Sequence, residues 1–131
     1  MANGRTILII EDEAPAIFSI SKALELSGYH VLQAFSAQEG ARLALENHPD
    51  LIITDLVMPA SSGMDVLKDL RRDIWGKNAK VIVFTNLSGD EHKANANKYQ
   101  VDKYLIKTDT SLKDLTECVS QLLSDNDAKQ P

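Results

Sequence analysis

The chain has 131 residues, of which 44% are hydrophobic and 25% charged, and its formal net charge is −5. These values fit one globular domain and argue against a disordered chain, because enough apolar surface is present to bury on folding. The acidic balance also argues against direct binding to nucleic acid, whose phosphates favour basic surfaces. No apolar run resembles a transmembrane segment or a signal peptide, and Cys118 has no second cysteine to pair with, so we expect a cytoplasmic monomer.

Five short runs rich in Ile, Val, Leu and Tyr predict β-strands. They are residues 6–10, 29–34, 51–54, 80–85 and 103–106. The first, third and fourth are almost unbroken apolar stretches, as central strands of a parallel sheet are. The second contains His30 and Gln33, which suits an edge strand.

Helical patterns lie between these runs. In the first of them, Ile17, Ile20 and Leu24 repeat at helical spacing. Pro15 stands in the first turn, where a helix tolerates proline, and Gly28 is placed to end the helix.

Four more segments predict helices. They are residues 37–47, 67–74, 89–99 and 112–122. The segment 89–99 has little apolar periodicity, so we expect it to be poorly buried and a candidate moving part. Strands that alternate with helices predict an α/β fold with right-handed crossovers and helices on both faces of a parallel sheet. We expect a flexible N-terminus over residues 1–5, one domain over 6–124 and a frayed polar tail over 125–131.

Polar side chains follow four of the predicted strands. Glu11 and Asp12 follow the first, Asp55 the third, Thr85 closes the fourth and Lys107 follows the fifth. Each has an ordinary explanation when taken alone, such as a helix N-cap for Asp12 or a turn for Asp55. The carboxyl ends of parallel strands meet at one edge of a sheet, however, and complementary groups at four strand ends predict a site there.

The chemistry of this set points to a divalent cation and a phosphoryl group. Three nearby carboxylates would raise at least one of their pKa values unless a cation intervened. Mg²⁺ prefers oxygen ligands, commonly one or two carboxylates with waters and phosphate oxygens. A carboxylate can attack phosphorus to form an aspartyl phosphate, with Lys and Thr side chains stabilising the transferred oxygens. Asp55 is the predicted nucleophile.

Several stretches resemble the receiver domain of two-component response regulators, of the single-domain type related to chemotaxis regulators. They are residues 9–13, 50–59, 63–64, 81–85 and 102–107. The resemblance implies a flavodoxin-like (βα)5 three-layer sandwich with strand order 2-1-3-4-5 and Mg²⁺ as cofactor. It also implies individual roles: Asp55 as phosphoacceptor, Glu11, Asp12, Asp55 and the backbone carbonyl of Val57 as metal ligands, Thr85 and Lys107 as phosphoryl contacts, and Tyr104 as the switching aromatic.

Two positions depart from the family pattern. Thr108 follows Lys107 where receivers usually carry proline after a cis bond, and a cis bond to a non-proline residue costs about 2.5–4 kcal/mol. Gln100 stands where the family usually has glycine, so a left-handed backbone there would cost about 1 kcal/mol. By the same resemblance, Val57 and Leu87 flank the path of water to a phosphoryl group. Neither side chain can orient water, which predicts slow autodephosphorylation.

The sequence therefore predicts a stand-alone receiver that takes a phosphoryl group from a histidine kinase or histidine phosphotransfer protein. Phosphorylation would change how the face of helix 4, strand 5 and helix 5 binds a downstream protein, without turnover of an external substrate. The alternative is a receiver-like scaffold that binds partners without phosphorylation, which Thr108 favours and the retained acidic groups oppose. A flavin carrier is disfavoured because the acidic residues 11–13 would repel a phosphate. An aspartyl-phosphate hydrolase is disfavoured because no segment is long enough to form a cap.

Overall fold

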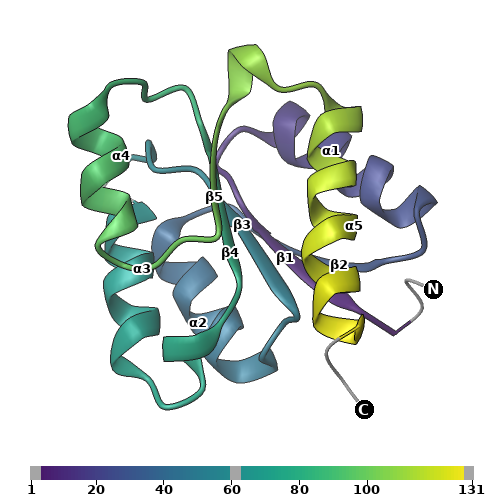
Figure 1. The fold of residues 1–131 in the computed structure, drawn as a ribbon, viewed down its shortest axis with the longest axis horizontal. Helices are drawn as coiled ribbons and strands as arrows, with labels where there is room; N and C mark the ends of the chain where they lie inside the picture. The colour runs from purple at the N-terminus through teal and green to yellow at the C-terminus, as the bar shows by residue number, and fades with distance from the viewer. Residues whose placement is uncertain (1–3, 60–62, 129–131) are drawn as a thin grey trace.

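A computed structural model describes residues 4–59 and 63–128, and it shows three layers with a parallel sheet in the middle (Figure 1). The strand order is β2-β1-β3-β4-β5, which confirms the predicted fold class. The strands are β1 (Thr6–Ile10), β2 (His30–Ala34), β3 (Leu51–Thr54), β4 (Val81–Thr85) and β5 (Lys103–Ile106). The helices are α1 (Ala14–Leu26), α2 (Ala37–Asn47), α3 (Gly63–Arg72), α4 (Asp90–Asn97) and α5 (Leu112–Ala128), with short 3-10 turns η1 (Gly76–Asn78) and η2 (Lys107–Asp109).

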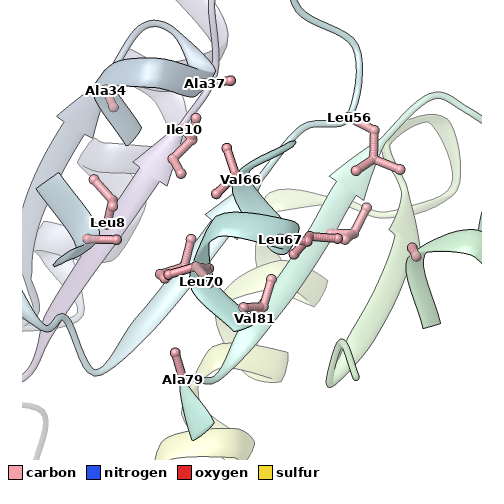
Figure 2. Packing of buried hydrophobic residues seen from close by; sticks show 14 of the residues in the cluster. Leu8, Ile10, Ala34, Ala37, Leu56, Val66, Leu67, Leu70, Ala79 and Val81 are labelled. Atoms are coloured by element: carbon pink, nitrogen blue, oxygen red, sulfur yellow. The ribbon is translucent and has the colours of Figure 1, made fainter. Parts of the chain in front are cut away.

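Helices cover both faces of the sheet, because successive residues of each strand point to opposite sides. Leu8 and Ile10 of β1 pack under Val66, Leu67 and Leu70 of α3 in one apolar cluster (Figure 2). The intervening β1 residues, Ile7 and Ile9, belong to a second cluster. That cluster is completed by α1 and α5, through Ile17, Ile20, Leu24, Leu115, Val119 and Leu123. Each fully buried aliphatic side chain contributes about 1.5–3 kcal/mol, so the two clusters hold the helices to the sheet.

The strand register brings the polar strand ends together. Ile10 at the end of β1 pairs with Thr54 at the end of β3, so the next residues along the chain, Glu11 and Asp55, leave the sheet at one edge. Thr85 at the end of β4 pairs with Ile106, which places Lys107 directly beyond it. This register assembles the site.

The helix ends agree in part with the sequence. Gly28 follows α1 with a φ of +96°, as its predicted role at the helix end requires. Ile74, expected in the helix over 67–74, lies beyond the end of α3 and is 87% exposed. The helix α5 continues to Ala128, past the predicted boundary at residue 124, because no Gly or Pro interrupts it there. Residues 1–3 and 129–131, expected to be flexible or frayed, lie outside the described residues.

Two positions depart from the family pattern, the bond between Lys107 and Thr108 and the backbone of Gln100. The described residues contain no cis peptide bond, so the bond between Lys107 and Thr108 is trans. Gln100 has a φ of +60°, in the left-handed region that glycine, the usual residue at this position of the family, adopts most easily.

Among the helices of the described residues, none is both long and apolar enough to cross a membrane.

Candidate functional site

Five of the predicted site residues, Asp12, Asp55, Val57, Leu87 and Lys107, line a cleft of about 580 Å³ at the carboxyl edge of the sheet. The backbones of Glu11 and Asp55 are held by the ends of neighbouring strands. Glu11 N donates to Ala34 O at 3.0 Å, and Asp55 N donates to Ile10 O at 3.1 Å. The cleft is lined by Asp12, Glu13, Asp55, Val57, Met58, Pro59, Asn86, Leu87 and Lys107.

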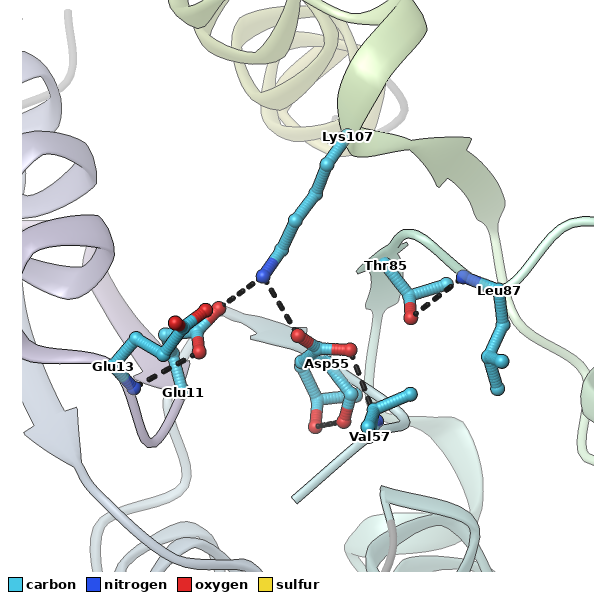
Figure 3. Close-up of polar contacts among 8 residues, drawn as sticks. Glu11, Glu13, Asp55, Val57, Thr85, Leu87 and Lys107 are labelled. Atoms are coloured by element: carbon cyan, nitrogen blue, oxygen red, sulfur yellow. Dashed lines mark hydrogen bonds and ion pairs between the residues drawn. The ribbon is translucent and has the colours of Figure 1, made fainter.

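Lys107 lies between two buried carboxylates (Figure 3). Its Nζ donates to Asp55 Oδ2 at 2.7 Å and also to Glu11 Oε1. The remaining oxygens have backbone donors: Val57 N donates to Asp55 Oδ1 at 3.0 Å, and Glu13 N donates to Glu11 Oε2 at 3.1 Å. Glu11 and Asp55 are only 2% and 6% exposed, so these hydrogen bonds replace most of their hydration.

Asp55 is ionised in this setting. Burial acts to raise its pKa, but the hydrogen bonds from Lys107, from the backbone of Val57 and from Thr85 outweigh burial and lower the pKa below its ordinary value. An ionised carboxylate at the base of an open cleft is the form that can attack phosphorus.

Glu11 and Lys107 respond differently to the same contacts. Burial raises the pKa of Glu11, and its hydrogen bonds with Lys107 and Glu13 only partly offset that rise. Burial acts to lower the pKa of Lys107, but its hydrogen bonds to Asp55 and Glu11 raise it above its ordinary value. Lys107 therefore stays charged and balances the two acids.

The three expected carboxylates do not form one metal-binding group. Within residues 4–59 and 63–128, no three His, Cys, Asp or Glu side chains lie close enough together to hold a metal ion. The repulsion expected between carboxylates is relieved by the ammonium of Lys107. Asp12 and Asp55 line the same cleft as Val57, and Mg²⁺ commonly needs only one or two carboxylates besides waters and phosphate oxygens. These residues fit Mg²⁺.

Thr85 and Tyr104 both hydrogen-bond to the backbone of one residue, Leu87. Leu87 N donates to Thr85 Oγ1 at 3.3 Å, and the Tyr104 hydroxyl donates to Leu87 O at 2.7 Å. Burial and then the charge of Asp55 raise the pKa of Tyr104, so its hydroxyl remains a donor. The predicted switch pair is thus joined through the loop that follows β4.

Other residues of the site were missed by the sequence interpretation. Asn86 and Glu13 line the cleft, and their position next to Thr85 and Asp12 was the available signal.

Gly63 begins α3 against the backbone of Asp55, and a Cβ built there would lie 2.1 Å from the Asp55 carbonyl oxygen. Glycine is therefore required for α3 to approach the loop after Asp55.

The family model of the response regulator receiver domain matches residues 7–120. The chain belongs to this family. Solved structures agree: a response regulator receiver domain protein from Clostridium thermocellum has a TM-score of 0.84 at 30% identity, covering 96% of this chain and 99% of that one. A CheY-like receiver domain protein from Methanospirillum hungatei has a TM-score of 0.87 at 24% identity, covering 96% and 98%, and shows the same fold.

Curated relatives are longer than this receiver. The phosphate regulon transcriptional regulatory protein PhoB of Pseudomonas aeruginosa is 34% identical over 104 residues, which are 79% of this chain and 45% of that protein. The DNA-binding dual master transcriptional regulator RpaA of Synechocystis is 37% identical over 101 residues, 77% of this chain and 42% of that protein. The chain spans less than half the length of these relatives. It is a receiver domain of two-component response regulators, a class of regulatory domains.

Proposed function

We propose that Asp55 is the phosphoacceptor of this receiver. The observation that carries the proposal is an ionised, hydrogen-bonded carboxylate that faces a cleft and contacts the ammonium of Lys107 at 2.7 Å. A phosphohistidine on a histidine kinase or histidine phosphotransfer protein would present phosphorus to the cleft. An oxygen of Asp55 then attacks phosphorus while the P–N bond breaks and its electron pair returns to the imidazole.

The residues around Asp55 take complementary roles in this proposal. Lys107, which contacts the carboxylate of Asp55 before phosphorylation, would then contact one oxygen of the phosphoryl group. The Thr85 hydroxyl would donate to a second phosphoryl oxygen. Asp12, Asp55 and the backbone carbonyl of Val57 would hold Mg²⁺, and Glu11 would add its negative charge beside them. Mg²⁺ supplies neutralisation of the charge on phosphoryl oxygens.

Phosphorylation would act on the face formed by α4, β5 and α5. It adds roughly −1.5 to −2 charges to a confined site, which draws Thr85 and Lys107 toward the phosphoryl oxygens. The hydrogen bond between Leu87 N and Thr85 Oγ1 would then break, and Tyr104 would follow the released loop. A difference of a few kcal/mol between the two states is enough to change the preference for a downstream protein.

We propose that the chain acts as a cytoplasmic monomer that signals through a separate downstream protein. Its net charge of −5 opposes direct contact with nucleic acid. Its own phosphorylation and slow dephosphorylation would be its only chemistry.

The test is incubation with acetyl phosphate and Mg²⁺, followed by intact mass and phosphate-affinity electrophoresis. We expect a mass gain of one phosphate in the parent and none in Asp55→Asn. Asp69→Asn, which changes an exposed carboxylate of α3, is the matched control and should be labelled like the parent. A parent that gains no phosphate would favour the scaffold function instead, and equal labelling of Asp55→Asn would place the acceptor elsewhere.

A further inference from the structure

The guanidinium of Arg71, in the last turn of α3, donates four hydrogen bonds to backbone carbonyls outside its own helix. Nε donates to Tyr99 O at 2.7 Å, and Nη2 donates to Gln100 O at 3.0 Å. Nη1 donates to Gly76 O at 2.6 Å and to Ala79 O at 3.0 Å. One side chain thus satisfies four carbonyls from two different connections.

These connections lead into two adjacent strands. Gly76 and Ala79 precede β4, while Tyr99 and Gln100 join α4 to β5. Burial lowers the pKa of Arg71, although the charge of Asp102 opposes that effect. The hydrogen bonds of a partly desolvated cation are strengthened because water competes less for them. Arg71 therefore ties the start of β4 and the start of β5 to α3.

The helix α4 has few other attachments. Among its eight described residues, Ala96 is the one that is buried, so α4 adds little apolar area to the core. Its N-cap, Gly89, makes no side-chain capping hydrogen bond. At the C-terminal end of α4, Arg71 donates hydrogen bonds to the carbonyls of Tyr99 and Gln100, which follow the helix. Its positive charge also stabilises the C-terminus of the helix dipole.

The two ends of α4 also face different parts of the molecule. The N-terminal end follows Asn86 and Leu87, which line the cleft beside Asp55. The C-terminal end lies at the edge of the sheet where the strands begin, next to the last turn of α3 (Figure 1). The weakly held end is thus the end near the cleft.

We propose that Arg71 anchors the C-terminal end of α4, so that α4 moves by swinging its N-terminal end at the cleft. Arg71 is a positioning residue that acts through the connection between α4 and β5. The inference does not depend on phosphorylation of Asp55, because it concerns the unmodified protein and is tested on it.

The experiment is residue-resolved amide hydrogen exchange by NMR on the unphosphorylated chain. In the parent, we expect the amides of Lys93 and Ala94 to exchange faster than those of Tyr99 and Gln100, all of which lie in or just after α4. The reverse order would overturn the inference, because the C-terminal end would then be the less firmly held one.

Variants of Arg71 separate an anchor from a general stabiliser. In Arg71→Met we expect the amide exchange rates of Tyr99 and Gln100 to rise above those of the parent. That rise should exceed any rise at Ile9, in the central strand β1, by about tenfold or more. Arg71→Lys should show a smaller excess, because an ammonium keeps the charge but lacks the planar fork of donors. It also keeps the test valid if Arg71→Met fails to fold. Arg72→Met, at an exposed position on the same turn, should match the parent. An equal rise at Gln100 and Ile9, or no rise, would show that Arg71 does not anchor α4.

Discussion

The Nζ of Lys107 lies 2.7 Å from Oδ2 of Asp55, although 51 residues separate them in the chain. The pair exists because Thr85 pairs with Ile106 and Ile10 pairs with Thr54, which brings the ends of β3 and β5 to one edge with β4 between them. The hydrogen bond from Lys107 helps to lower the pKa of Asp55 and so keeps its carboxylate ionised. This contact leads to the first of four predictions.

The pH dependence of stability should carry the signature of this ion pair. The pKa of Asp55 is lowered from 3.8, so its contribution is present above that value and is lost as pH falls through the folded-state pKa. The pKa of Lys107 is raised from 10.5, so its contribution is present below that value and is lost as pH rises through the folded-state pKa. We expect Asp55→Asn to flatten the acid limb of a plot of melting temperature against pH, and Lys107→Met to flatten the alkaline limb.

Asp69→Asn serves as the control for the acid limb, because its carboxylate is exposed. The measurement is thermal unfolding by circular dichroism without metal. Acid limbs of equal steepness in the parent and Asp55→Asn would contradict the role assigned to Lys107.

Magnesium should stabilise the fold through Asp12. When the free Mg²⁺ concentration is ten times the dissociation constant, binding to the folded state adds about 1.4 kcal/mol to the free energy of unfolding. We expect Mg²⁺ to raise the melting temperature of the parent but not that of Asp12→Ala. Glu25→Ala, which removes an exposed carboxylate of α1, should keep the full response. The same melting temperature for the parent in Mg²⁺ and in EDTA would argue against the metal site.

The aspartyl phosphate should be long-lived because apolar side chains border the cleft. Val57 and Leu87 line it together with Asp55, and neither can orient a water molecule for attack. We expect Val57→Asn combined with Leu87→Glu to speed the decay of radiolabelled phosphate, within the limit of about 10²–10⁴-fold for such effects. Ile74→Asn, a change of an 87% exposed side chain beyond α3, is the control for added polarity. An unchanged or longer half-life in the double variant would show that water exclusion is not the cause.

Replacement of Gln100 by glycine should stabilise the protein. Gln100 has a φ of +60°, and a residue with a Cβ loses roughly 1 kcal/mol in that conformation relative to glycine. We expect Gln100→Gly to raise the free energy of unfolding in urea by about that amount, whereas Gln100→Ala should stay close to the parent because it keeps the Cβ. If the glycine and alanine variants are equally stable, the backbone at Gln100 is not strained.

The sequence by itself determined the layers of the fold and which polar side chains stand at one edge of the sheet. Unbroken apolar runs such as 51–54 and 81–85 can only be buried on both faces, which requires a parallel sheet covered by helices. Asp55, Thr85 and Lys107 stand immediately at strand ends, and the geometry of a parallel sheet sends them to one edge. Local periodicity and spacing were sufficient for these conclusions.

The tertiary structure decided how those residues share charge and how the moving parts are held. The repulsion expected among three carboxylates is offset between Glu11 and Asp55, because Lys107 lies between them. Burial acts to raise the pKa of both acids, and only at Asp55 do the hydrogen bonds outweigh it and lower the pKa. Desolvation depends on everything packed around a group, so no local pattern reports it. Arg71 looks like an ordinary helix cation in the sequence. Its four carbonyl partners lie in the connections that precede β4 and β5, distant in the chain from each other and brought together by the pairing of these strands.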